Sequence, residues 1–168
     1  AFIMAVMMVP TQVFAIGFYQ FMMKINLLDT YWPLIIPGIT TPAVVFFMKQ
    51  YMEGALSPEL VEAARIDGAS EMQNLWYIVV PLAKPIMTSV MLIVFVNTWN
   101  EFLFSNTFLQ KEEMRTVSLR FFNFVGKNGA DYGYIYAAAI ISILPIIIIY
   151  FLMQDSFVEG MTTGSVKG

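Results

Sequence analysis

Three polar residues, Asn97, Asn100 and Glu101, lie in the last part of a long apolar stretch and are the side chains best suited to bind a polar solute. Their spacings of three and four place them on one face of a helix. A charge inside a bilayer costs at least about 2.5–3.5 kcal/mol, so this face is expected to point away from lipid. It would either line a path for a solute or make hydrogen bonds between helices, and the sequence leaves both roles open.

Several kinds of chemistry are excluded by the residue types that the chain lacks. It has no Cys and no His, which removes disulfides, thiol chemistry, His-based metal sites and Ser-His or Cys-His hydrolytic arrangements. No Gly-Lys phosphate-binding loop occurs, so the chain is not expected to hydrolyse ATP itself. The net charge of −3 gives no reason to expect a nucleic-acid partner. An intramembrane enzyme would need a pair of carboxylates, and Glu101 is the only acid inside a predicted span.

The elements that position these residues are predicted to be membrane-spanning helices. Hydrophobic residues form 58% of the 168-residue chain and charged residues only 12%, about half the share that is typical of soluble domains. A helix needs about 20 mostly apolar residues to cross the hydrocarbon layer. The sequence therefore predicts an all-α integral membrane protein with four spanning helices. Their apolar runs are residues 1–23, 31–48, 85–104 and 132–154.

A compact charged insert, residues 53–81, lies between the second and third apolar runs. Ser57 and Pro58 are typical of a helix start, as an N-cap and a first helical position. Asp67 and Gly68 are typical of a helix end, because Gly readily adopts the left-handed conformation that follows the last turn. The insert is therefore predicted to begin with a short helix that ends in a tight turn.

A second helix is predicted to follow this turn. Ser70 and Gln73 have the S-x-x-Q spacing of a capping box, and the helix is expected to end at Pro81. The insert as a whole is then a helix–turn–helix. The alternative, an amphipathic helix lying on the lipid surface, does not account for the turn.

The insert resembles the EAA loop of ABC importer permeases, the membrane subunits of binding-protein-dependent uptake systems. The signature of that loop is E-A-A, three residues, G, nine residues, then I-x-L-P. The only departure here is Val80, which stands where Leu is usual. The stretches MMVP, EAARIDGAS, WNEF and GMTTGSVKG further resemble the carbohydrate-uptake branch of the family, and within it the smaller maltose-type permease. The matching positions are Glu62, Ala63, Ala64, Gly68, Ile78 and Pro81.

The resemblance implies that residues 1–168 are the C-terminal part of a single permease domain that usually has six spans. The loop, with Asp67 in its turn, would dock on a separate ATPase subunit, which would bind the ATP; this chain would bind no cofactor and no metal. A second, homologous permease, a pair of ATPase subunits and an extracytoplasmic binding protein would complete the assembly. The substrate would be a sugar. A polyol or glycerol phosphate remains the nearer alternative, and a channel or an intramembrane enzyme the more distant ones.

Orientation in the membrane also depends on the resemblance. Lys and Arg number four on the side of the insert and five on the opposite side, so charge gives no orientation. The family likeness places the loop and the C-terminal tail in the cytoplasm of a multi-pass cell-membrane protein. It also implies that the tail, with Gly164 and Lys167, contacts the ATPase pair, whereas a frayed terminus is the alternative.

Overall fold

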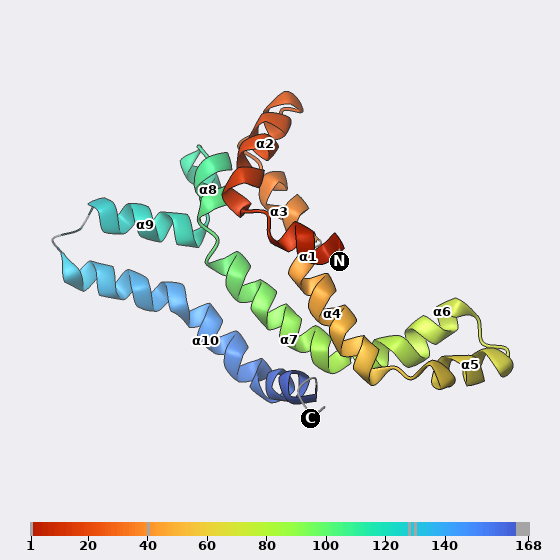
Figure 1. The fold of residues 1–168 in the computed structure, drawn as a ribbon. Coiled ribbons are helices and arrows are strands. Elements are labelled where there is room, and N and C mark those ends of the chain that lie inside the picture. Colours follow the sequence, from red (N-terminus) through yellow and green to blue (C-terminus); the bar gives the residue numbers. More distant parts are fainter. Residues whose placement is uncertain (1, 40, 128, 130, 164–168) are drawn as a thin grey trace.

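The computed structural model describes residues 2–39, 41–127, 129 and 131–163, with side chains up to residue 154. The described chain is helical and contains no strand, which confirms the predicted all-α class (Figure 1). Its elements follow in the order α1 (Phe2–Met7), α2 (Thr11–Lys24), α3 (Trp32–Ile39), α4 (Pro42–Ala55), α5 (Pro58–Ile66), α6 (Glu71–Asn74), the π-helix η1 (Leu75–Val79), α7 (Val80–Trp99), α8 (Leu103–Phe108), the 3-10 helix η2 (Glu112–Met114), α9 (Val117–Lys127) and α10 (Tyr132–Thr163).

Three segments of the described chain are long and apolar enough to cross a membrane. They are Trp32–Ala55, which comprises α3 and α4, Glu71–Trp99, which runs from α6 through α7, and Tyr132–Gln154, the larger part of α10. None of the most apolar part of the α10 segment is buried within the chain. Such a surface requires a cover of lipid or of other protein, as expected for a membrane helix.

The first of the four predicted spans, residues 1–23, is not confirmed among the described residues. Pro10 separates this run into α1 and α2, and its backbone is extended, with φ −61° and ψ 130°. Proline lacks the N–H that would continue the hydrogen bonding of α1. The longer part, α2, has 14 residues, fewer than the approximately 20 that a bilayer requires.

The helix that begins after the turn of the insert does not end at Pro81, contrary to the sequence prediction. It continues through η1 into α7, so that residues 71–99 are one uninterrupted helical segment. In η1 the N–H of Val80 donates to the carbonyl of Leu75, five residues back, which widens the turn just before the proline. Pro81 then lies in the first turn of α7, where a missing N–H is tolerated.

Helix α7 is the centre of the fold and packs against α4 on one side and α10 on the other (Figure 1). Ala83, Ile86 and Val90 form the buried contact with α4. Towards the end of α7, the indole N–H of Trp99 donates to the carbonyl oxygen of Ser142 in α10 at 2.9 Å. This bond joins the last turn of α7 to the middle of the third spanning segment.

A second cluster joins the N-terminal helices to α8. Ala15 and Met22 of α2 pack there on Phe104 and Phe108 of α8. A short connection, residues 25–31, joins α2 to α3, and its Asp29 carboxylate accepts hydrogen bonds from the backbone N–H groups of residues 110 and 111. The region after α8 contains a further helix, α9, which was not predicted.

Candidate functional site

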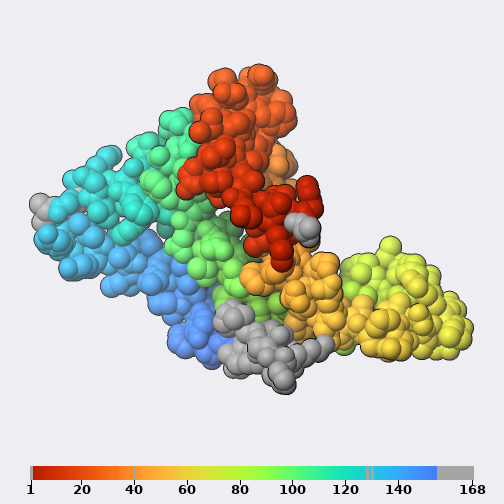
Figure 2. Space-filling view, in the orientation of Figure 1, coloured from red at the N-terminus to blue at the C-terminus, as the bar shows by residue number. Residues whose placement is uncertain are grey.

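The insert forms a lobe that projects away from the spanning helices, and the space-filling view shows it as a separate yellow and yellow-green body (Figures 1 and 2). Its first helix, α5, starts as the sequence predicts. The Ser57 hydroxyl accepts a hydrogen bond from the Leu60 N–H at 3.3 Å, and Pro58 occupies the first turn. Residues 53–81, called the coupling loop below, therefore have a defined shape before any partner binds.

The turn at the tip of the coupling loop requires glycine. Gly68 has φ +85°, the predicted left-handed conformation, and Asp67 is the C-cap of α5. The N–H of Gly68 donates to the Arg65 carbonyl and the N–H of Ala69 to the Ala64 carbonyl, at 3.0 and 2.9 Å. These bonds occupy carbonyl groups that the end of a helix leaves open. A residue with a side chain at position 68 would strain this turn, although no atom lies within 4 Å of where its Cβ would be.

The second arm of the loop is fixed by the predicted capping box. The Ser70 hydroxyl accepts from the Gln73 N–H at 3.3 Å, while the Gln73 side-chain oxygen accepts from the Ser70 N–H at 2.8 Å. An additional ion pair crosses the turn, because Arg65 Nε donates to a Glu71 carboxylate oxygen at 2.8 Å. This hydrogen bond, and secondly the charge of Glu71, raise the pKa of the Arg65 guanidinium.

The Arg65–Glu71 pair was not predicted, because its members are six positions apart and a turn lies between them. Spacings of three or four predict contacts along one helix, and no such pattern reports contacts across a bend. The pair is exposed, so its contribution to stability is small.

The E-A-A residues are available to a partner and are not packed within this chain. Glu62 and Ala63 are exposed and Ala64 is half-buried. The Glu62 carboxylate makes no hydrogen bond within the part of the chain that the structure describes. Close packing of the two alanines, and a hydrogen-bond partner for Glu62, would therefore have to come from a second protein. Ile78 and Pro81 lie farther along the second arm, half-buried and exposed respectively.

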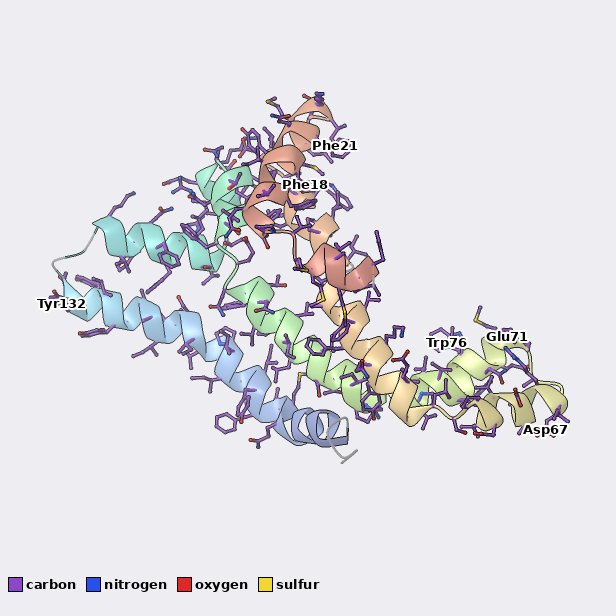
Figure 3. All side chains as sticks on the ribbon, viewed as in Figure 1. Phe18, Phe21, Asp67, Glu71, Trp76 and Tyr132 are labelled. Atoms are coloured by element: carbon purple, nitrogen blue, oxygen red, sulfur yellow. The ribbon has the colours of Figure 1, made fainter. Side chains whose placement is uncertain are left out.

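The coupling loop is strongly acidic. It contains five acidic residues, Glu53, Glu59, Glu62, Asp67 and Glu71, against the single basic residue Arg65. Glu59 lies in the first turn of α5, where its own backbone N–H and then the Ser57 hydroxyl lower the pKa of its carboxyl group. Asp67 is at the tip of the loop, away from the spans (Figure 3). A basic surface would complement this charge.

Of the three polar residues predicted for a translocation path, only Asn97 lies within α7, so the continuous helix assumed for their shared face is not present, and their role in a path stays a prediction. Asn97 lies in α7, but the helix ends at Trp99, and Asn100 is its C-cap. Glu101 follows the helix end and belongs to the connection to α8. The third predicted span therefore ends about five residues earlier than expected, because Asn100 bonds back onto α7: its side-chain Nδ2 donates to the Val96 carbonyl at 2.9 Å.

Glu101 caps the start of α8, the next helix. Its carboxylate accepts hydrogen bonds from the N–H of Phe104 at 2.6 Å and the N–H of Ser105 at 2.9 Å, and from the Ser105 hydroxyl at 3.0 Å. These are the bonds of a carboxylate that caps the first turn of α8. The charge is compensated locally, by groups at the start of α8, and these bonds do not join two spanning helices.

The two asparagines line separate hollows. Asn97 borders a space of about 170 Å³ between α4 and α7. Asn100 borders a larger one of about 450 Å³ between α7, α9 and α10, whose other walls include Trp99, Phe122 and Ser118. Aromatic walls with a few polar groups are typical of sites for small polar ligands. Sequence analysis did not identify this second hollow, because α9, which supplies Phe122 and Ser118, was not predicted.

Two predicted features remain to be placed. Gly164 and Lys167 of the tail lie outside the described residues, so their contact with an ATPase stays a prediction. Among the residues that the structure describes, no three Asp or Glu side chains gather where they could hold a metal ion.

Comparisons with known proteins place this chain among membrane transport components. It is 33% identical over 166 residues to the arabinooligosaccharides transport system permease protein AraQ of Halalkalibacterium halodurans, covering 99% of this chain and 59% of that protein. It is 30% identical to the melibiose/raffinose/stachyose import permease protein MelC of Bacillus subtilis, covering all of this chain and 62% of that protein. For the trehalose/maltose transport system permease protein MalG of Thermococcus litoralis, the identity is 34% and the coverage 99% and 61%.

This chain thus spans about three fifths of the length of these curated relatives. Residues 1–163 match the family described as binding-protein-dependent transport system inner membrane component. Together with the three membrane-capable helical segments, this match makes the chain part of a multi-pass membrane protein. The chain belongs to the family of inner membrane components of binding-protein-dependent ABC transport systems, the family that its EAA-like loop resembled.

Proposed function

We propose that this chain is part of a permease subunit that imports a sugar by alternating access, driven by ATP hydrolysis on a separate ATPase pair. The observation that carries the proposal is the preformed coupling loop. Its turn and caps hold it rigid, while Glu62, Ala63 and the acidic tip remain open to a partner. In this arrangement the loop and the C-terminal end of α10 are cytoplasmic, and ATP binds the partner and not this chain.

The connection between the loop and the spans supports a mechanical role. Residues 71–99 form one helical segment, so a force on the second arm of the loop would move α7 as a lever. At its far end, α7 carries Trp99 and Asn100, which border the 450 Å³ hollow beside α9 and α10. Closure of the ATPase pair would therefore change the hollow through rigid movement of α7, the type of motion that alternating access requires.

Both the names of the relatives and the walls of this hollow favour a sugar as the substrate. The relatives named above transport oligosaccharides or disaccharides. Trp99, Phe121 and Phe122 offer aromatic surfaces, and Asn100, Ser118 and Ser142 offer hydrogen-bonding groups. A polyol or glycerol phosphate is the second candidate, and a homologous permease and an extracytoplasmic binding protein are the proposed further partners.

The proposal is tested by Gly68→Val and Glu62→Lys in the full-length permease. Gly68→Val strains the turn by roughly 1–2 kcal/mol, and Glu62→Lys reverses a charge at the docking surface. Neither change is large enough to expel spanning helices from the membrane. Both variants are therefore expected to insert and to pair with the second permease, but to retain less ATPase on purification and to lose ATP-driven sugar uptake.

The same substitution at another glycine is the control. Gly17, in α2 on the opposite side of the molecule, also has no atom within 4 Å of a Cβ position and does not need a positive φ. Gly17→Val should retain the ATPase and transport normally. Normal ATPase retention and uptake in both loop variants would show that the loop is not the coupling element.

A further inference from the structure

A hollow of about 480 Å³ lies between α9 and the first half of α10, two helices that run side by side (Figure 1). It is a different space from the 450 Å³ hollow beside α7, although Phe121 and Ser142 border both. It lies at the opposite end of the fold from the coupling loop (Figure 1). The proposed coupling mechanism does not use this hollow.

Two cationic side chains at the rim of this hollow have no carboxylate partner. Arg115 and Glu112, which also line it, form an ion pair at 3.3 Å and compensate each other. Arg120 donates to the backbone carbonyl oxygen of Glu112 at 2.8 Å, which leaves the charge of its guanidinium uncompensated. Lys127 forms no ion pair within the part of the chain that the structure describes. Arg120 and Lys127 are both exposed, so the hollow offers two uncompensated positive charges to an anion.

Both cations lie on one face of α9. Seven residues separate Arg120 from Lys127, which corresponds to about two turns and about 10 Å along the helix. Two long, flexible side chains can close around a single phosphate group over this distance. Asn123 lies between them in the sequence, also lines the hollow and adds an amide donor. The rim of the hollow therefore has the donors that a phosphate group requires.

The floor of the hollow is apolar and continues along α10. Ile141 lines the hollow and is 66% exposed. Leu144, Ile148 and Leu152 follow it at spacings of three and four, so these side chains form one exposed stripe on α10. The stripe is about 16 Å long, and one hydrocarbon leaflet is about 15 Å deep. A ligand that covers both the hollow and the stripe has an anionic head and a long apolar chain.

Aromatic side chains place this hollow at the boundary between membrane and water. Tyr132, Tyr134 and Tyr136 surround the first turn of α10 and are each 64% exposed (Tyr132 is labelled in Figure 3). Trp99, at the end of α7, bonds to the carbonyl oxygen of Ser142 ten residues after Tyr132. Tyr and Trp are enriched at the membrane–water boundary, and the hollow lies between these two aromatic levels. Helix α9 is strongly amphipathic, as are helices that lie in this boundary.

We propose that this hollow binds an anionic phospholipid of the leaflet opposite the coupling loop. The phosphate lies between Arg120 and Lys127, and one acyl chain lies on the α10 stripe. The two cations select against a zwitterionic lipid, because its own cationic group would lie beside them. The stripe selects against a free anion such as inorganic phosphate, which would leave the apolar side chains uncovered.

Native mass spectrometry of the full-length permease complex tests the charge requirement. The complex is delipidated in detergent and titrated with phosphatidylglycerol or phosphatidylcholine. The wild type should bind phosphatidylglycerol at least about tenfold more tightly, because each cation near a lipid headgroup contributes about fivefold. Lys127→Gln should weaken this binding about fivefold, and Arg120→Gln combined with Lys127→Gln roughly thirtyfold. Lys111→Gln removes the same charge at an exposed position outside the hollow and should have no effect.

Ile148→Ser distinguishes a lipid from a free anion. Ile148 lies on the stripe and outside the hollow, so its replacement removes apolar contact without altering the cations. Phosphatidylglycerol binding should weaken several-fold. Ile147→Ser, at an exposed position about 100° around the helix, is the matched control and should bind as the wild type does. Displacement of the lipid by millimolar inorganic phosphate, or wild-type binding in Ile148→Ser, would overturn the lipid assignment.

The remaining outcomes separate a lipid from a protein partner. Equal affinity for the two lipids, or wild-type affinity for phosphatidylglycerol after loss of both cations, would overturn the proposal. If loss of both cations weakens only the binding of a purified extracytoplasmic binding protein, these cations contact a protein and the lipid site is wrong. The lipid titration requires neither ATP nor sugar, so its failure would leave the coupling function standing. Gly68→Val should bind phosphatidylglycerol normally.

Discussion

Glu101 belongs to the start of α8, where three hydrogen-bond donors converge on its carboxylate. The carboxylate is half-buried near the end of a spanning segment, where an uncompensated charge would be costly. The backbone N–H groups at the start of α8 and the Ser105 hydroxyl compensate it. Ser105 also accepts a hydrogen bond from the Thr116 hydroxyl at 3.2 Å, so the Glu101 cluster extends to the segment before α9.

Replacement of Glu101 should therefore affect stability before it affects selectivity. Glu101→Ala leaves the Phe104 and Ser105 N–H groups without their acceptor and should destabilise the α8 region by about 1–3 kcal/mol. Glu101→Gln keeps an acceptor oxygen and should lose less. The measurements are hydrogen exchange of residues 103–108 and the sugar specificity of uptake. A changed specificity with unchanged exchange would instead support the role of Glu101 in lining the translocation path.

The helix caps and the turn of the coupling loop could be predicted from the sequence, whereas contacts between the two arms of the loop could not. Gly68 and Ser70 were predicted correctly because the conformation of a turn or cap is set by residues within three or four positions. The Arg65–Glu71 pair was not predicted, since its surroundings exist only after the two arms of the loop fold together. The face assigned to Asn97, Asn100 and Glu101 failed because a helix was assumed to continue past residue 99.

At the scale of elements, Pro81 and η1 together set the orientation of the loop relative to α7. The π-helical turn inserts one extra residue before the proline, and one residue corresponds to a rotation of about 100° around a helix. Sequence analysis took Pro81 as a helix end because a proline usually breaks a regular α-helix. The widened turn of η1 accommodates Pro81, and a hydrophobic pattern does not reveal where such a turn lies.

Pro81→Ala should allow the widened turn to relax into α-helix and rotate the loop against the spans. Stability should stay equal or rise, because alanine favours a helix and restores an N–H donor. ATP-driven uptake should fall, because the loop would face its partner wrongly. The chain has no native Cys, so spin labels on Ile66→Cys and Ile140→Cys, both at exposed positions, would report the rotation as a changed distance.

Pro85→Ala is the matched control, because Pro85 lies inside α7 and beyond the widened turn. It should leave the label distance and uptake unchanged. If Pro81→Ala also leaves the distance unchanged, the π-helical turn does not depend on the proline.

For the whole molecule, the main feature is the large exposed apolar surface along α10. Large side chains along α10, such as Ile141 and Phe151, are 66% and 64% exposed. A surface of this kind requires a cover of lipid or of other protein. The class of fold follows from the apolar runs, but the number of spans does not, because the break at Pro10 shows that a run can be long enough without forming one helix.

The C-terminal tail of the chain continues directly from helix α10. The helix continues for nine residues past the end of its apolar span at Gln154, on the same side of the spans as the coupling loop. A polar extension there would meet an ATPase docked on the loop. Deletion of residues 160–168 should therefore reduce ATPase retention or uncouple ATP hydrolysis from uptake. Replacement of the same residues by a Gly-Ser segment of equal length tests whether specific residues, including Gly164 and Lys167, are needed. Wild-type transport after the deletion would identify the tail as a frayed end.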